Sequence, residues 1–339
     1  MIITEGVDSF VFPHRSGPRV GLCRIFHVFG AVGFDFFDTV QGVAPRCVEH
    51  EGPRGIFPIL APMKTIVITG ASDGIGAAAA RIISTACPED RLVLVGRNPG
   101  KTEGVAKQLD AEWHTADYAD LDQVRRLAGE LAALDRIDVL ANNAGGIFAG
   151  PKKTVDGFEL TWQINVVAPY LLTNLLMPVL LESRASVVAT SSNGALFAKF
   201  DESDPNTFKG FTSDRAYGNA KLGNILFTKE LHRRYHSAGM NAVAFHPGII
   251  SSNFGQEDAG LLGRMFQSPV SRFFSTPEFG GENLAYHIAG VPGIHWESGR
   301  YYDEKRRPGR QRAIAHDLDV ARRVFDDMAA SLEVEWPEG

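Results

Sequence analysis

Three glycines follow the first strongly hydrophobic run of the chain, at a spacing that suits phosphate binding. The run KTIVIT (64–69) predicts a strand covered on both faces, and an alanine-rich helix (77–86) is expected after Gly70, Gly74 and Gly76. Glycine allows positive φ and close approach of the backbone to a pyrophosphate, and the helix N-terminus offers free N–H groups. Because the spacing is G-x-x-x-G-x-G rather than G-x-G-x-x-G, a tight turn without a ligand is the alternative.

A phenol, an amine and a pair of hydroxyls lie further along the chain. Tyr217 and Lys221 stand in YGNAK on a predicted helix, and their spacing of four puts both side chains on one face. Ser191 and Ser192 close the strand-like run SVVATSS (186–192). A Y-x-x-x-K pair is common by chance, so on its own it predicts no activity.

Asparagines supply the remaining polar candidates. The stretch NNAG (142–145) follows a predicted strand, where small residues let a ring stack against backbone; a simple turn is the alternative. Asn165 lies in a long helical region (155–183) that we expect to begin near Asp156. A buried amide inside a helix is costly unless it is used, and tying a strand edge to the helix is a competing use.

Strand-like runs alternate with helical ones from Lys64 onward. This alternation predicts an α/β fold with a doubly wound parallel sheet, a single Rossmann-type domain whose ligands lie beyond the carboxyl ends of the strands. The six expected strands are 64–69, 91–96, 112–117, 137–141, 186–192 and 240–245.

Residues after the second and third strands bear on the choice of dinucleotide. Gly96 and Arg97 stand where an acidic residue would bind the ribose of NAD, and a guanidinium can pair with a 2′-phosphate. We therefore expect NADP(H), with a surface arginine that binds nothing as the alternative. Asp117 either accepts a hydrogen bond from the adenine amino group or caps the helix 121–134.

Composition excludes several classes of function. The net charge of −6 gives no general attraction to nucleic acid. Three cysteines without C-x-x-C spacing predict neither disulfides nor zinc, and we expect a cytoplasmic protein. His232 and His236 are four apart, but the arginines between them favour a solvated helix end, so no metal site is expected. The basic stretch 300–312 favours an exposed loop, and no apolar run is long enough for a membrane anchor.

The first 62 residues differ in character from the rest. Glycine and proline recur there without a lasting helical or strand period, and Met63 stands directly before the first strand. Our hypothesis is that residues 1–62 are a mis-called upstream translation or a disordered extension, and that the domain is 63–339. A genuine appendage packed on the domain is the alternative.

Taken together, the motifs resemble the short-chain dehydrogenase/reductase family. The matching elements occur in the family's order and cover about 64–330; they are TGASDGIG (69–76), NNAG (142–145), Asn165, Ser191-Ser192, YGNAK (217–221) and HPG (246–248). The phrases TVDGFELTWQINVVAPYLLTNLL and AYGNAKLGNILFTKEL resemble the branch of retinol dehydrogenases and WW-domain oxidoreductases.

The resemblance implies a carbonyl–alcohol oxidoreductase that uses a nicotinamide cofactor, with four catalytic residues. These would be Asn165, Ser192, Tyr217 and Lys221. The cofactor would contact Gly70, Ser72, Asp73, Gly74, Ile75, Gly76, Arg97, Asn98, Asp117, Asn143, Ala144, Gly145, Tyr217, Lys221, Pro247, Gly248 and Ile250. Asp73 departs from NADP-preferring relatives, which often carry a basic residue there, and this leaves Arg97 as the main partner of a 2′-phosphate.

The chemistry of this scheme depends on the acidity of Tyr217. A free tyrosine has a pKa of about 10, too high for efficient proton exchange near neutrality. A nearby ammonium favours the phenolate, so we expect Lys221 to lower the pKa of Tyr217. Ser192 would hold the substrate oxygen, and Asn165 would support a water that links Lys221 to solvent. The scheme requires no metal, since the cofactor carries the hydride step.

The segment 249–276 is rich in phenylalanine and leucine and, by resemblance, forms a substrate loop. This favours an apolar ketone, aldehyde or alcohol enclosed by a mobile lid, while simple packing on the core is the alternative. The sequence is compatible with a homodimer or a homotetramer. Two rival functions are a dinucleotide-binding sensor or scaffold without turnover, and a reductase of carbon–carbon double bonds.

Overall fold

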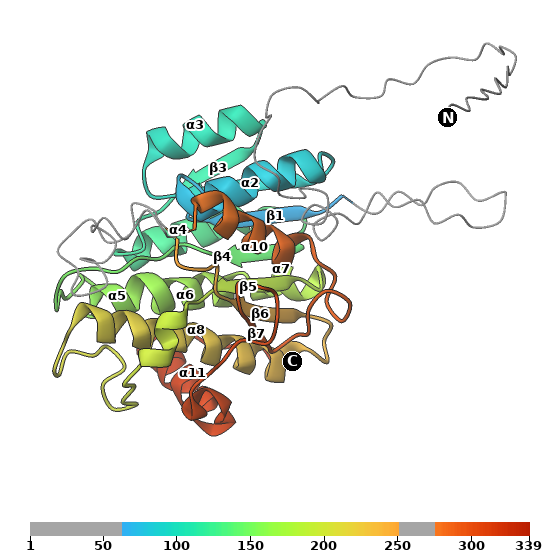
Figure 1. Cartoon of the computed structure of the whole chain (residues 1–339). Coiled ribbons are helices and arrows are strands. Elements are labelled where there is room, and N and C mark those ends of the chain that lie inside the picture. Colours follow the sequence, from blue (N-terminus) through green and yellow to red (C-terminus); the bar gives the residue numbers. More distant parts are fainter. Residues whose placement is uncertain (1–62, 251–274) are drawn as a thin grey trace, which may run out of the picture.

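A seven-stranded parallel sheet forms the centre of the computed structural model, which describes residues 63–250 and 275–339 (Figure 1). Its strand order is β3-β2-β1-β4-β5-β6-β7. The strands are β1 (Thr65–Thr69), β2 (Arg91–Gly96), β3 (Glu112–Thr115), β4 (Val139–Asn142), β5 (Ser186–Thr190), β6 (Asn241–Phe245) and β7 (Tyr301–Tyr302). The predicted doubly wound α/β fold is thereby confirmed. The hypothesis on residues 1–62 and most of the predicted substrate loop lie outside the described residues.

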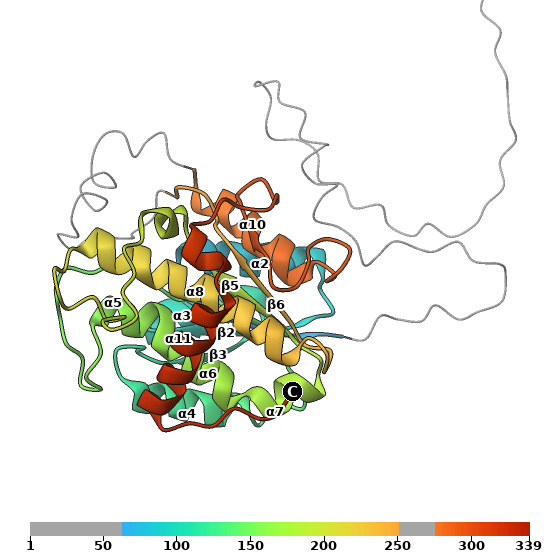
Figure 2. The same cartoon turned by 90° about the horizontal axis from the view of Figure 1, so that it is seen from below.

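Helices cover both faces of the sheet (Figures 1 and 2). One face carries α2 (Gly74–Ala86), α3 (Pro99–Leu109) and α10 (Pro277–Ala289). The other carries α4 (Leu121–Leu131), α5 (Leu160–Trp162), α6 (Ala168–Leu175), α7 (Met177–Glu182) and α8 (Ser213–Tyr235), with α11 (Leu318–Leu332) packed on α8. No described helix is both long and apolar enough to cross a membrane.

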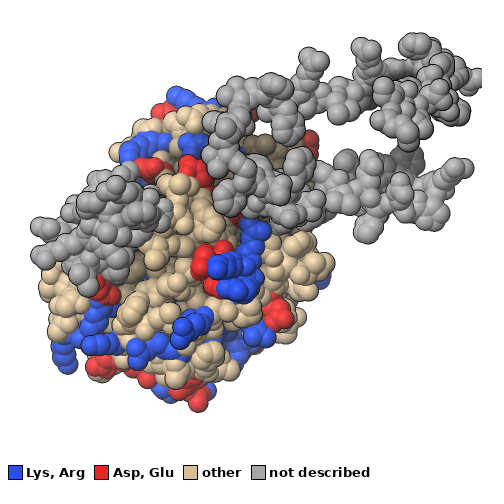
Figure 3. Space-filling view, viewed as in Figure 1, with Lys and Arg blue, Asp and Glu red and all other residues tan. Residues whose placement is uncertain are grey.

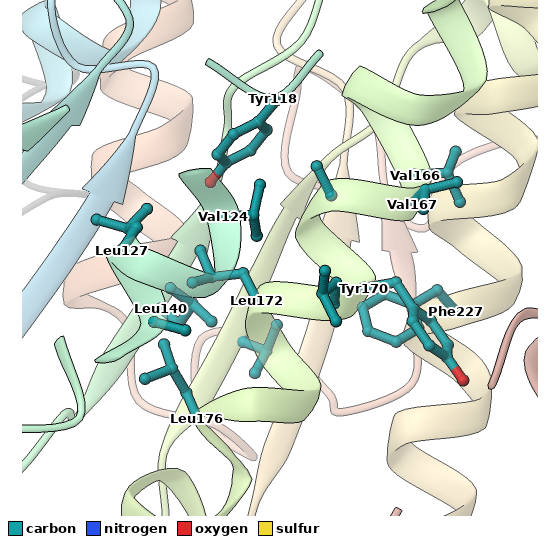
Figure 4. Packing of buried hydrophobic residues seen from close by; sticks show 14 of the residues in the cluster. Tyr118, Val124, Leu127, Leu140, Val166, Val167, Tyr170, Leu172, Leu176 and Phe227 are labelled. Carbon is teal, nitrogen blue, oxygen red and sulfur yellow. The ribbon is translucent and has the colours of Figure 1, made fainter. Parts of the chain in front are cut away.

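The alternating directions of strand side chains create a separate core on each face. In β1, Ile66 and Ile68 pack toward α2 and α10, whereas Val67 packs toward α4 and α6. All five residues of β1 are buried, which explains why the strand is a continuous apolar run. Figure 4 shows part of the second core, where side chains of β4, α4, α6 and α8 meet.

The structure corrects several predicted boundaries. The third strand ends at Thr115 and the fifth at Thr190, so Asp117 and Ser192 lie in the loops beyond them. The strand β7, which pairs with β6, was not predicted. The helical region begins at Leu160 rather than near Asp156, whose carboxylate instead accepts the amide N–H of Leu121 (3.0 Å) in another element.

The expected long helix 155–183 is in fact four short segments. Glu159 caps the first segment by accepting the N–H groups of Thr161 and Trp162. A π-helical turn, η1 (Gln163–Val167), then interrupts the helix before α6 begins at Ala168. Such turns carry an extra residue and occur often at functional sites.

Candidate active site

The glycine turn after β1 lies against the loop after β4, at the point where the sheet order reverses. Gly70 has φ +68°, and a Cβ atom added there would lie 2.9 Å from Cα of Ala144. The hydroxyl oxygen of Thr69 accepts the N–H groups of Asn143 and Ala144, both at 3.0 Å. These contacts fix the two loops together at the carboxyl edge, which is where open α/β sheets bind ligands.

The start of α2 is open on the side of this edge. Gly74, the first residue of the helix, has φ +56°, and a Cβ atom added there would meet nothing within 4 Å. Asp73 caps the helix by accepting the N–H of Gly74 (2.8 Å), and its other oxygen pairs with Nζ of Lys101 at 3.1 Å. Sequence reasoning missed Lys101, because an exposed lysine on a neighbouring helix gives no local signal.

The other residues predicted around this turn pack closely or cap helices. Ser72 lies beside Gly96, where an added Cβ would be 2.8 Å from Cβ of Ser72, and Ile75 packs on Gly280 of α10. Asn98 caps α3 by accepting the N–H of Lys101 at 3.0 Å.

Arg97 and Asp117 lie at the ends of β2 and β3, apart from the residues of α8. Arg97 is exposed, and within the described ranges no hydrogen bond or ion pair engages its guanidinium. Asp117 accepts the N–H of Ala119 at 3.0 Å, whereas the cap of α4 is Asp120. Of the two alternatives for Asp117, capping of this helix is therefore wrong. Its carboxylate accepts an N–H within the loop after β3, and the contact with adenine stays a prediction.

The structure separates the roles of the two serines after β5. The Ser191 hydroxyl is buried and donates to the carbonyl of Lys221 at 2.7 Å. The Ser192 hydroxyl instead accepts the N–H of Gly194 (3.0 Å) and hydrogen-bonds the side chain of Tyr217. Only Ser192 is therefore available to act together with Tyr217.

Tyr217, Lys221 and Asn165 converge at the same edge, from α8 and η1. Nζ of Lys221 lies 5.6 Å from the centre of the Tyr217 ring and donates to the carbonyl of Thr190 at 3.0 Å. A Cβ atom added at Gly145 would lie 3.2 Å from that Nζ and 2.4 Å from Oδ1 of Asn165. The glycine at this position is what lets the loop after β4 approach both side chains.

Asn165 ties the loop after β4 to the helix. Its amide nitrogen donates to the carbonyls of Gly146 and Thr161, each at 2.8 Å, and its oxygen accepts the N–H of Gly146 at 3.1 Å. The structural use of the amide, which the sequence left open, is therefore present. Whether Asn165 also supports a water next to Lys221 stays a prediction.

Burial shifts the pKa values of both Tyr217 and Lys221, and the shift of Tyr217 is opposite to the one we expected. It raises the pKa of Tyr217 to about 12, although the hydrogen bond with Ser192 opposes the shift. It also lowers the pKa of Lys221 to about 7. We expected the ammonium to lower the pKa of Tyr217. That expectation is wrong for the protein alone, because removal of water disfavours the charged forms of both groups.

The loop after β6 brings the last predicted residues to this edge. Pro247 is buried, Gly248 has φ +102°, and Ile250 packs against Gly280 at the start of α10. The preceding residue, His246, is 2% exposed and contacts both this loop and Glu304. Sequence reasoning used His246 only as part of a motif and did not find Glu304, since the two are far apart in the chain.

Two other features of the sequence are the histidine pair His232 and His236 and the basic stretch 300–312. The rings of His232 and His236 are 4.6 Å apart, and His232 contacts Ser298; no described group of three side chains could hold a metal ion. In the basic stretch, Arg300 pairs with Glu297. On the face drawn in Figure 3, positive and negative residues are mixed.

The comparisons with known proteins agree with this arrangement. A model of the short chain dehydrogenase family matches residues 64–259, so the chain belongs to this family. Retinol dehydrogenase 14 of Mus musculus is 34% identical over 305 residues, which cover 83% of this chain and 89% of the relative. The Streptomyces sp. (strain C5) protein named "Putative daunorubicin C-13 ketoreductase DnrU" is 32% identical over 292 residues, covering 84% and 96%. A crystal structure of a Mycobacterium Paratuberculosis protein matches with a TM-score of 0.65 and 27% identity, covering 81% of this chain and 95% of that one.

These findings confirm the predicted family, its retinol dehydrogenase-like branch and the class of enzyme. The protein is an oxidoreductase that acts on CH–OH or carbonyl groups.

Proposed function

We propose that this protein is an NADP(H)-dependent oxidoreductase that interconverts an apolar ketone or aldehyde with its alcohol, with Tyr217 as general acid and base. The observation that carries the proposal is the convergence of Tyr217, Ser192 and Lys221 at the carboxyl edge of the sheet, with Lys221 beside Gly145 and the other two beside Gly194. Tyr217 and Lys221 come from α8 and Ser192 from the loop after β5, and three groups of this kind suit proton transfer.

The described residues fit a dinucleotide. The start of α2 combines open space at Gly74 with the N–H groups of a helix terminus, a combination suited to a pyrophosphate. When bound, the nicotinamide supplies or takes up the hydride. We assign to the cofactor Gly70, Ser72, Asp73, Gly74, Ile75, Gly76, Arg97, Asn98, Asp117, Asn143, Ala144, Gly145, Tyr217, Lys221, Pro247, Gly248 and Ile250.

Proton transfer then falls to the chain's own side chains. With a pKa of about 12, the phenol of Tyr217 is protonated near neutral pH and can give its proton to a carbonyl oxygen during reduction. Ser192, already hydrogen-bonded to Tyr217, would hold that oxygen. Alcohol oxidation needs the phenolate instead. We therefore expect the oxidation rate to rise with pH.

The preference for NADP(H) over NAD(H) follows from charge near the ribose position. The guanidinium of Arg97 is exposed and engages no described partner, so it is free to bind a phosphate. The carboxylate of Asp73, which would repel a phosphate, is paired with Lys101. Together these residues favour the 2′-phosphorylated cofactor.

An apolar substrate is supported by the side chains near Ser192. Phe197 is 74% exposed in the 3₁₀ turn η2 (Asn193–Phe197), which begins next to that serine. The names of the relatives, a retinol dehydrogenase and a ketoreductase, fit an alcohol or ketone. The cytoplasmic location, the homodimer or homotetramer, and the start of the native protein at Met63 stay predictions.

Tyr217→Phe tests the proposed mechanism. The variant keeps the ring but loses the transferable proton, so we expect kcat to fall by about 10²–10⁴-fold while NADPH affinity changes little. Turnover is followed by nicotinamide absorbance over a panel of ketones, aldehydes and secondary alcohols, and affinity by calorimetry. Tyr235→Phe is the matched control, because that hydroxyl donates to the carbonyl of Pro337, away from the site. Full activity of Tyr217→Phe would contradict the mechanism.

Arg97→Asp tests the choice of cofactor. We expect about 10–100-fold weaker NADPH binding with NADH binding unchanged or improved, because the substitution replaces a phosphate partner with a like charge. Lys107→Gln on α3, where the lysine pairs with Glu103, serves as the control. If the variant keeps its preference for NADPH, Arg97 does not bind the 2′-phosphate.

A further inference from the structure

His246 is held between two elements by both of its ring nitrogens. Nδ1 lies 3.0 Å from the backbone nitrogen of Gly248, and Nε2 lies 2.7 Å from a carboxylate oxygen of Glu304. The ring is 2% exposed, so water cannot substitute for either partner at low cost. Gly248 has φ +102°, a conformation open to glycine but rarely adopted by residues with a side chain.

The two contacts define the tautomer of the ring. The backbone N–H of Gly248 can only donate, so Nδ1 must be the unprotonated acceptor. The proton of the neutral imidazole is therefore on Nε2, and it is donated to Glu304. A protonated imidazolium would present N–H at both positions and lose the contact with Gly248.

Glu304 is itself anchored to the neighbouring helix. Its backbone carbonyl accepts the side-chain N–H of Asn283 on α10 at 3.0 Å. On the same helix, His287 contacts the carbonyl of Asn283 at 2.8 Å and stacks on Phe245 of β6. The position of the His246 ring is thus set jointly by β6, α10 and the segment after β7.

We propose that His246 is a positioning residue, whose Nδ1 acceptor sets the conformation of the cofactor-binding loop 247–250 while Glu304 holds the ring in place. The proposal rests on the proposed function, which assigns Pro247, Gly248 and Ile250 to the cofactor. In it, His246 touches neither cofactor nor substrate and acts through the backbone of Gly248. Loss of the acceptor frees the loop and weakens cofactor binding.

The arrangement also makes cofactor binding sensitive to acid. Burial lowers the pKa of His246, while Glu304 and Asp303 from the segment after β7 oppose that shift. Of the side chains named above, α10 contributes the uncharged Asn283 and the buried His287. As the pH falls through the pKa of His246, the ring gains a proton at Nδ1 and the contact with Gly248 is lost. Replacing Glu304 by a neutral residue lowers that pKa further and moves the loss of binding to lower pH.

Two substitutions separate the functions of the two nitrogens. In His246→Asn, the side-chain oxygen can take the place of Nδ1 as acceptor, but the contact with Glu304 is lost. In His246→Gln, the amide nitrogen can take the place of Nε2 as donor, but the acceptor for Gly248 is lost. The control is His232→Gln, a partly buried histidine that contacts Ser298 away from the site.

Calorimetry with NADP⁺ at about pH 8 gives the first test, with thermal unfolding as a check on folding. We expect His246→Asn to bind within about twofold of the unmodified protein, and His246→Gln to bind about tenfold more weakly, the effect of one lost hydrogen bond. Equal affinities of the two variants would overturn the proposal. If the unmodified protein binds neither NADP⁺ nor NAD⁺, the proposed function fails instead.

The second test uses pH and does not depend on the folding of His246→Gln. NADP⁺ affinity is measured from about pH 8 to about pH 5, and His246→Asn supplies the baseline, because the 2′-phosphate itself titrates near pH 6. We expect the unmodified protein to lose affinity in acid beyond this baseline, and Glu304→Gln to move that additional loss to lower pH. No additional loss, or no movement in Glu304→Gln, would overturn the proposal.

Discussion

The two sides of the candidate site differ in the kind of groups that form them. The side formed by β1, α2 and the loop after β4 consists largely of backbone groups and glycines. Gly70 and Gly76 are packed too closely to accept a side chain, and Gly74 faces open space. The side formed by β5 and α8 consists of buried titratable side chains, with Lys221 3% exposed and the pKa of Tyr217 raised by burial to about 12. We therefore expect the first side to be sensitive to added atoms, and the second side to keep or gain stability when a titratable group is removed.

Gly76→Ala is expected to have the largest effect. A Cβ atom at this position would lie 2.3 Å from the carbonyl oxygen of Gly70, and backbone cannot move aside as a side chain can. We expect the free energy of unfolding to fall by about 3 kcal/mol and cofactor binding to be lost. Denaturant unfolding and calorimetry measure both.

The matched control for this variant is Gly129→Ala on α4. An added Cβ there would meet nothing within 4 Å, so the exchange should raise stability by about 0.5–1 kcal/mol. If Gly76→Ala and Gly129→Ala change the free energy of unfolding and cofactor binding to a similar extent, close packing at Gly76 does not set the sensitivity of this side of the site.

Lys221→Met is expected to trade activity for stability. The folded protein holds Lys221 with a pKa of about 7, against 10.5 for an ordinary lysine. Between these values the unfolded chain binds more protons, so the free energy of unfolding of the unmodified protein rises with pH. The methionine variant should be more stable at pH 7 by a few kcal/mol, at about 1.4 kcal/mol per pKa unit, and this gain should narrow toward pH 10.

Denaturant unfolding across this pH range measures the effect, and turnover should be lost in the same variant. Lys107→Gln provides an exposed lysine for comparison, with 73% of its side chain accessible. If the methionine variant is less stable than the unmodified protein at pH 7, burial of the Lys221 amine does not destabilise the folded state as proposed.

The smallest effects are expected from the serine pair. Ser192→Ala should lower kcat about 100-fold, because its hydroxyl faces Tyr217, and should cost about 1 kcal/mol of stability, because the same hydroxyl accepts the N–H of Gly194. Ser191→Ala should cost about 1 kcal/mol of stability and leave most activity, because its hydroxyl bonds the carbonyl of Lys221. Activity assays and denaturant unfolding of both variants decide this, and a reversed pattern would exchange their roles.

Local signals predicted the fold and the positions of most site residues. The β-branched runs and the glycine turn identify β1, β2 and α2, because each depends on residues adjacent in sequence. The two-residue strand β7 carries no such signal and exists only through pairing with β6.

Through-space effects were beyond sequence reasoning. The pKa direction of Tyr217 depends on how completely α8 is covered, and the pairing of Asp73 with Lys101 depends on how α2 and α3 pack. The choice of Ser192 over Ser191 as the catalytic serine came only from the resemblance, and it stays a prediction. The structure adds the physical reason, which is the carbonyl of Lys221.

The π-helical turn makes Asn165 vulnerable to the smallest change in chain length. Each residue in a regular helix advances by about 100° around the axis. Deletion of Ile164 is expected to convert the π-helical turn into regular α-helix and to rotate the Asn165 amide away from Gly146. The sheet would not change. Loss of this one residue is therefore expected to free Asn165 from the loop after β4 without any substitution at Tyr217, Ser192 or Lys221.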